Sequence, residues 1–156
     1  DALGLTPLHL VAESDADATG VRELLKWLTD PRDTSAGGIG DRVGRTPLHH
    51  AAVNGQLPFL LALLERRADH SRRDVSGATP LHLAAEWAAV ASSADTADGL
   101  VQALLAARAS AQAVTEDGRT PLELARRRLA GTAGAAADGA RMARLSVLLA
   151  PPPLPR

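Results

Sequence analysis

Apolar residues along the chain fall into pairs of short clusters, and each pair opens with the tetrapeptide Thr-Pro-Leu-His or a close variant. In the first cluster of a pair, leucine is followed by small residues such as Ala-Ala, which gives a short helix one narrow apolar face. The second cluster is more aliphatic, as in residues 59–64 and 100–105. The pattern therefore predicts consecutive helical hairpins, none of which can bury its apolar face without a neighbour.

The tetrapeptide occurs four times, and its copies define a tandem repeat. The copies begin at Thr6, Thr46, Thr79 and Thr120, so successive copies are 40, 33 and 41 residues apart. The shortest spacing is the basic unit, and the two longer spacings contain 7 and 8 inserted residues. In the last copy Glu123 replaces the histidine.

The residues before each tetrapeptide predict a tight turn that leads into a helix. Glycine, which accepts a positive φ without strain, lies two residues before every threonine. Aspartate lies five residues before the threonine in three copies, and a threonine takes that place in the fourth. The tetrapeptide threonine suits a helix N-cap, and its proline suits the first helical position. The turn positions are Asp1, Gly4, Asp41, Gly44, Asp74, Gly77, Thr115 and Gly118.

This D-x-x-G-x-T-P-L-H pattern on a 33-residue period closely resembles the ankyrin repeat. The resemblance extends to about Ala150 and implies an all-α solenoid of stacked helix-turn-helix units with β-turn fingers. Residues 1–150 would form one domain, and the proline-rich residues 151–156 an extended tail or linker. The tail could alternatively serve as a ligand for a proline-binding domain. The repeats are expected at about 1–40, 41–73, 74–114 and 115–150.

The first two repeats differ in length but share the same predicted hairpin. In the first, helices are expected near 6–13 and 21–28, with Trp27 at the border of the second helix's apolar stripe. In the second, Gly55 falls between the two helices. Arg67 occupies the position where the family usually has the glycine that ends the second helix, which predicts a modest local cost.

The last two repeats carry inserted or atypical segments. In the third, residues 92–99 are predicted to form a solvated loop between the helices, and an alanine-rich start extends the first helix by a turn. In the fourth, residues 131–139 are predicted as a loop and 140–150 as a helix. The arginines at 126–128 suit a terminal unit whose outer face meets water.

Composition narrows the class of protein. The 156 residues contain no cysteine, which argues against a disulfide-stapled secreted protein and against a thiolate metal site. Neither a signal peptide nor an apolar run of membrane-spanning length is visible. We therefore expect an intracellular protein, cytoplasmic or nuclear, that does not insert into membranes and is a monomer in isolation. Because the chain begins with Asp1 instead of methionine, we expect it to be a piece of a longer protein.

The charge distribution gives no general affinity for nucleic acid. The net charge is −1, and it alternates along the chain as −4 in residues 1–40, +2 in 41–78, −2 in 79–114 and +3 in 115–156. This alternation suits a mixed, hydrated surface or local patches that orient a partner. The arginines at positions 66, 67, 72, 73 and 126–128 could contact phosphates, but few aromatics lie among them, so a solvated face is favoured.

Candidate catalytic and metal chemistry is sparse. His9, His49 and His82 occupy the same position in successive repeats, and stacked helices lie about 8–10 Å apart. That separation is too large for a shared zinc ion, so each imidazole is expected to bridge backbone groups of adjacent turns. His50 shows no evident partner. No nucleophile, phosphate-loop or metalloprotease motif is present, so we expect no enzyme activity, no cofactor and no metal.

The resemblance implies a binding surface along the finger tips and the inner face of each first helix. Trp87 stands out, because binding hot spots are enriched in Trp and Arg. Its alternative role is to pack beneath the lengthened loop of the third repeat. A surface centred on Trp87 would be flanked by arginines 42, 45, 119 and 127. The expected contact residues are Arg42, Val43, Arg45, Val53, Asn54, Val75, Ser76, Glu86, Trp87, Glu116, Asp117, Arg119, Arg127 and Arg128.

Three functions follow from these observations. The first is a non-catalytic module that binds a partner protein through its concave face. The alternative is a regulatory or substrate-recruiting region of a larger enzyme whose catalytic domain lies elsewhere. Nucleic-acid binding is the third, and it predicts association that weakens steeply with salt.

Overall fold

A computed structural model describes residues 5–11, 38–131 and 135–150. Within these ranges the regular structure is entirely helical, as the sequence predicts. The predicted helix at 21–28, with Trp27, and the tail at 151–156 lie outside the described residues. The helices are α1 (Pro7–Val11), α3 (Pro47–Val53), α4 (Leu57–Glu65), α5 (Pro80–Val90), α6 (Ala94–Ala106), α7 (Pro121–Ala130) and α8 (Ala135–Leu148).

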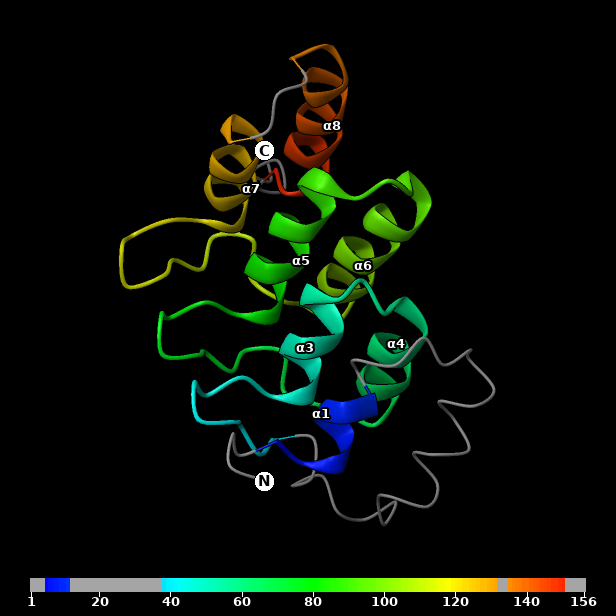
Figure 1. The fold of residues 1–156 in the computed structure, drawn as a ribbon, viewed down its shortest axis with the longest axis vertical. Coiled ribbons are helices and arrows are strands. Elements are labelled where there is room, and N and C mark those ends of the chain that lie inside the picture. The colour runs from blue at the N-terminus through cyan, green and yellow to red at the C-terminus, as the bar shows by residue number, and fades with distance from the viewer. Residues whose placement is uncertain (1–4, 12–37, 132–134, 151–156) are drawn as a thin grey trace, which may run out of the picture.

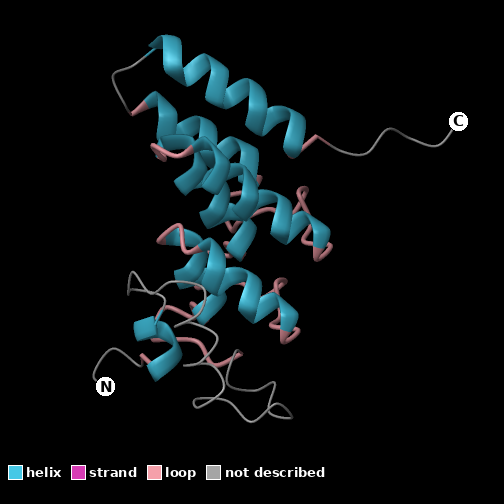
Figure 2. Ribbon diagram, turned by 90° about the vertical axis from the view of Figure 1, so that its right-hand side faces the viewer, coloured by secondary structure: helices cyan, strands magenta, loops and turns pink. Residues whose placement is uncertain are grey.

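The helices form two columns of a single stack (Figure 1). The first helices of the repeats contact one another in the order α1, α3, α5 and α7. The second helices α4, α6 and α8 also follow one another, each beside the first helix of its repeat. The turns that precede α3, α5 and α7 project to one side as fingers (Figure 1), and Figure 2 shows the same succession from the side. The molecule is thus an all-α solenoid.

Small residues on the inner helices allow the columns to approach closely. Ala51 and Ala52 on α3, and Ala84 and Ala85 on α5, are fully buried. The larger aliphatic and aromatic side chains of α4 and α6, such as Phe59, fill the space between the columns. A fully buried side chain of that size contributes about 1.5–3 kcal/mol by leaving water.

Each finger is a turn whose polar groups are satisfied internally. In the finger of the third repeat, the carboxylate of Asp74 accepts hydrogen bonds from the backbone of Ser76 and Ala78 at 2.9 and 3.0 Å. The turn closes through a glycine with positive φ, +76° at Gly44 and +75° at Gly77. These are the conformations that the Asp and Gly positions predict.

Adjacent fingers are also joined to each other. The backbone N–H of Val75 donates to the carbonyl of Val43 at 2.9 Å, and that of Glu116 donates to the carbonyl of Ser76 at 3.0 Å. One backbone hydrogen bond thus connects each of these finger tips to the next, and the series forms a ladder along the tips. The finger side of the solenoid is therefore held by backbone contacts as well as by helix packing.

The repeated histidine connects each helix to the next finger. Nδ1 of His49 accepts from the backbone N–H of Thr46 at 3.1 Å, so the proton of the neutral ring is assigned to Nε2. Nε2 then donates to the carbonyl of Ala78, 3.2 Å away in the next repeat. His9 and His82 make the same bridge to the carbonyls at positions 45 and 119, at 2.8 and 3.1 Å. The predicted structural role of these histidines is confirmed.

The fourth repeat keeps only half of this bridge. The carboxylate of Glu123 accepts from the backbone N–H of Thr120 at 2.7 Å and from its hydroxyl at 2.9 Å. The first turn of α7 is therefore capped as in the other repeats. An ionised carboxylate has no hydrogen to donate, so the onward half of the bridge is missing.

The predicted loop at 92–99 is wrong for most of its length. The first helix of the repeat does extend by a turn, as α5 runs to Val90, but α6 already begins at Ala94. The hydroxyl of Ser93 caps α6 by accepting from the backbone N–H of Thr96 at 3.4 Å. Ala97 is 2% exposed and joins the core. The inserted residues lengthen both helices because a serine cap and a buried alanine outweigh the polar composition.

The predicted boundary in the fourth repeat is also wrong. The helix α8 begins at Ala135, whereas the sequence pattern suggested position 140. Alanine has the highest intrinsic helix propensity, and a run of three alanines before Asp138 and Gly139 is enough to start the helix. The predicted loop is therefore shorter than 131–139.

Two arginines end the second helices in a left-handed conformation. Arg67 has a φ of 60° and Arg108 a φ of 70°. In each case the following alanine donates its backbone N–H back to the helix, Ala68 to Leu63 and Ala109 to Leu104, both at the distances of good hydrogen bonds. This is the six-to-one bond of a glycine-ended helix, made here without glycine. The left-handed conformation expected at Arg67 is confirmed, and its modest cost stays a prediction.

We predict that Arg67→Gly stabilises the protein by about 0.5–1 kcal/mol, because glycine adopts positive φ without the Cβ clash. Arg67→Ala is the matched control, since it removes the same side chain but keeps the strain. Urea denaturation of the three proteins gives the comparison. A glycine variant no more stable than the alanine variant would contradict the strain argument.

A second prediction concerns acid stability. Burial, which outweighs the hydrogen bond to Ala78 and the charge of Asp74, lowers the pKa of His49 from 6.5 to about 4. The unfolded chain binds this proton below about pH 6.5 and the folded chain does not, so the stabilisation is complete above that pH and is lost towards pH 4. The loss attributable to His49 is on the order of 3 kcal/mol.

Urea denaturation at several pH values between 4 and 6.5 measures this effect. The variant His49→Gln does not titrate in that window and should show a shallower dependence of the unfolding free energy on pH. His82, whose pKa burial also lowers, remains in the variant, so the dependence should not vanish. Identical slopes for the two proteins would refute the assignment to His49.

Candidate functional site

A groove runs along the inner helices across three successive repeats. One hollow of about 290 Å³ and a second of about 580 Å³ share the lining residues Glu86 and Arg128, and are therefore adjacent. The first hollow is lined by Arg45, Val53, Leu83, Glu86, Trp87, Val90 and Arg128. The second is lined by Glu86, Leu124, Arg127, Arg128 and Gly131.

Trp87 forms an apolar wall of the first hollow. Its side chain is half-buried and packs against the core, and it also rests on the turn between α3 and α4. A Cβ placed on Gly55 would lie 2.1 Å from Cζ2 of the indole, so the ring lies directly against that glycine. The loop that would have covered Trp87 is largely helix α6 instead. The ring is thus fixed by the preceding repeat while part of it faces the groove.

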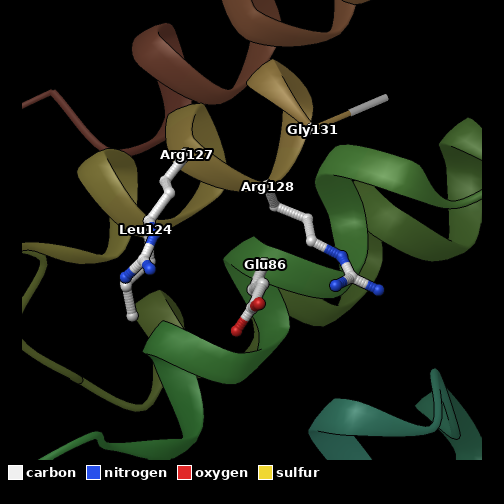
Figure 3. A pocket seen from close by; sticks show the side chains of 5 residues that line it. All are labelled: Glu86, Leu124, Arg127, Arg128 and Gly131. Carbon is white, nitrogen blue, oxygen red and sulfur yellow. The ribbon is translucent and has the colours of Figure 1, made fainter. Parts of the chain in front are cut away.

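The charges of the second hollow are close to one another. In Figure 3, Arg127 and Arg128 descend from α7 on either side of the Glu86 carboxylate, which projects from α5. Among the described residues, neither of these two guanidinium groups forms an ion pair. Both arginines are exposed. They are therefore free to bind a group supplied by another molecule.

Arg45 differs, because the fold already uses its charge. Its Nε lies 3.2 Å from the carboxylate of Asp74, which is almost fully buried. Burial alone would raise the pKa of Asp74, but hydrogen bonds from Ser76, Ala78 and Arg45 outweigh it and lower that pKa. Arg45 therefore stabilises the next finger as well as lining the groove.

Apart from Asn54, the remaining predicted contact residues lie on the fingers. Asn54 is exposed at the end of α3, and Ser76 is held at its tip by a 2.6 Å hydrogen bond to Asp74. The guanidinium of Arg119 lies 3.6 Å from the exposed carboxylate of Asp117. Exposed positions along the ladder of tips are Arg42, Val43, Val75, Ser76, Glu116 and Asp117.

Some lining residues escaped the sequence analysis. Leu83 and Val90 flank Glu86 and Trp87 on α5 at helical spacings of three and four residues. The 3.6-residue period of a helix places these four on one face. That periodicity was the signal from which the apolar part of the groove could have been found.

The expectation for His50 is wrong, since it has a partner. Its Nε2 lies 2.9 Å from the carboxylate of Asp41, whose other oxygen accepts from the backbone N–H of Val43 and Arg45. Its ring also meets that of His9 edge to face, with centroids 4.9 Å apart. The partner was missed because the finger folds back over α3, which the nine-residue separation in sequence does not reveal. This histidine belongs to the packing of the finger.

Other chemistry is limited within the described ranges. No group of three side chains there could hold a metal ion. Of the arginines considered for phosphate contact, Arg73 donates to the carbonyls of Gly77 and Val114 and so braces two fingers. Among the helices that the structure describes, none combines the length and apolar character needed to cross a membrane.

Comparison with known proteins agrees with the repeat geometry. The family model described as Ankyrin repeats (3 copies) matches residues 1–74. The chain is an ankyrin repeat protein. Ankyrin repeats are protein-interaction modules and are generally not catalytic.

Curated relatives of this ankyrin repeat protein are Neurogenic locus notch homolog protein 1 from several vertebrates. The Xenopus tropicalis protein is 36% identical over 126 residues, the Danio rerio protein 32% over 126 and the Homo sapiens protein 34% over 127. Each alignment covers 80% of this chain but only 4–5% of the relative. The likeness thus concerns one small part of much longer proteins.

Proposed function

We propose that this ankyrin repeat protein binds a partner polypeptide in the groove between its fingers and inner helices. The observation that carries the proposal is the adjacency of the two hollows, which share Glu86 and Arg128 and are lined by residues of α3, α5 and α7. A peptide or helix laid along the stack would meet side chains from three repeats. The binding unit is residues 1–150, and residues 151–156 serve as its linker.

Trp87 is the residue of this surface that we expect to contribute most to the free energy of partner binding. An indole held against the Gly55 backbone has already lost much of its conformational freedom, so binding orders it at little further cost. Its exposed part adjoins Val53, Leu83 and Val90, which form an apolar floor. A partner side chain that covers this floor would release water from both surfaces.

The finger tips extend the surface. Val75 is 64% exposed and Val43 is 43% exposed, and the backbone ladder fixes both at neighbouring tips. Exposed valines on a rigid scaffold offer apolar contact without reorganisation. The same pattern supports binding at the tips as well as in the groove.

A regulatory or substrate-recruiting role within a larger enzyme is the second candidate. It is favoured by one observation, that the relatives are far longer than the aligned segment. The binding surface would be the same in both cases. The two functions differ only in what is joined to the ankyrin unit.

Affinity capture with the purified chain, followed by calorimetry with the captured partner, tests the proposal. Trp87→Ala should weaken binding at least about tenfold, as expected for a central aromatic anchor. Val147→Ala is the control, because Val147 is 76% exposed on α8 and lies outside both hollows. It should bind as the wild type does.

A second variant separates binding from folding, because Trp87 also packs within the protein. Val75→Asp places a charge on an exposed finger tip without altering the core. It should lower the affinity for the same partner several-fold. Circular dichroism and urea unfolding establish that each variant is folded. A partner that binds both variants with wild-type affinity would show that the site lies elsewhere.

A further inference from the structure

The groove carries two unlike subsites one repeat apart. The first, between α3 and α5, has an apolar wall of Val53, Leu83, Trp87 and Val90, and charged residues complete its lining. The second, between α5 and α7, is dominated by Arg127 and Arg128. Arg128 lines both hollows, so the two subsites are adjacent and one occupant can reach both.

The charge around the second subsite is incompletely matched. Among the described residues that line the two hollows, Glu86 is the one carboxylate, and three are arginines. Arg45 is paired with Asp74, which leaves two guanidinium groups and a single carboxylate in the second hollow, with the arginines on either side of Glu86. The fold therefore presents one uncompensated positive charge at this position, beside the groove's apolar wall.

Guanidinium groups bind carboxylates through paired hydrogen bonds in a fixed geometry. We infer that the groove selects an acidic segment of a partner protein, with an apolar side chain against Trp87 and a carboxylate at Arg127 and Arg128. The inference rests on the proposed function, since it specifies the occupant of the same groove. Because Glu86 already contributes one negative charge beside the two arginines, a partner segment with several adjacent carboxylates is disfavoured relative to one with a single carboxylate.

The stack sets the spacing of these two groups. Neighbouring helices pack about 8–10 Å apart, and an extended chain advances about 3.3 Å per residue. The apolar and acidic side chains would therefore be about three residues apart in an extended segment. In a helical segment, which rises about 1.5 Å per residue, they would be about six residues apart, and the nearest position on the same face of the helix is about seven residues along.

Selection from a random peptide library displayed on phage tests this inference, because the library itself supplies the binding segments. Peptides selected on the wild-type chain should combine an apolar residue with Asp or Glu at one of these spacings. The double variant Arg127→Gln and Arg128→Gln should bind the selected peptides about tenfold more weakly. Binding to the wild type should weaken as salt rises, and this dependence should be reduced in the double variant.

Arg126→Gln is the matched control. Arg126 is exposed on the same helix and has the same charge, but it lines neither hollow. Its substitution should change peptide affinity less than about twofold. Equal losses for the control and a single substitution at Arg127 or Arg128 would indicate general electrostatic attraction and overturn the assignment.

Trp87→Ala distinguishes failure of this inference from failure of the proposed function. Peptides that require Trp87 but show no acidic preference would overturn the inference and leave the groove as the binding site. Selected peptides whose affinity is unchanged by substitution of Trp87 and of the two arginines would overturn both the inference and the proposed function. Single-stranded DNA that binds through the same two arginines more tightly than any peptide would overturn the choice of a polypeptide.

Discussion

The hydrogen bond from each repeated imidazole to the next finger is the interaction on which this structure depends. One ring nitrogen accepts from the start of its own helix and the other donates to a carbonyl of the following repeat, as His49 does with Thr46 and Ala78. A buried carbonyl without a donor would cost about 1–3 kcal/mol. The bridge removes that cost and fixes the position of one repeat relative to the next, so short helices that would not persist alone can stack.

Because the fingers are fixed from within, their outer positions are available for recognition. Asp74 holds its turn, receives Arg45 from the preceding finger and remains almost fully buried. The hydrogen bond from Val75 to the carbonyl of Val43 uses only backbone atoms, so the valine side chain is not needed for it. The fold thus separates the residues that build the surface from those that face a partner. This separation explains how one scaffold can present many different surfaces.

The sequence predicts the regular part of this fold because the decisive interactions are local. Turn, cap and first helical turn lie within nine residues, and each residue type has a direct geometric reason. The inserted segments follow no such rule. Ser93 was equally compatible with a loop or a helix cap, and only the burial of Ala97 against neighbouring helices decides between them. The left-handed Arg108 was overlooked although it stands before Ala109 as Arg67 stands before Ala68, so the repeat position that identified Arg67 could also have identified Arg108.

The composition of the groove could be predicted only in part. The family's variable positions led to Trp87, Glu86 and Arg128, which line one hollow in the structure. The contact of the indole with Gly55 could not be foreseen, because it depends on how far apart two repeats lie. The pairing of Arg45 with Asp74 was missed for the same reason, as the partners are separated by 29 residues. Contacts between repeats become visible only in the structure, whereas contacts within a repeat can be predicted from the sequence.

Because the indole of Trp87 packs against Gly55, its fluorescence can report on the interface between the second and third repeats. Indole emission shifts to longer wavelength when the ring enters water, so a chain with Trp27 replaced by phenylalanine would signal the opening of this one interface. Circular dichroism would record loss of helix along the whole stack. A difference between the two melting curves would reveal that the array comes apart in stages, and a single shared curve would show that it melts as a unit.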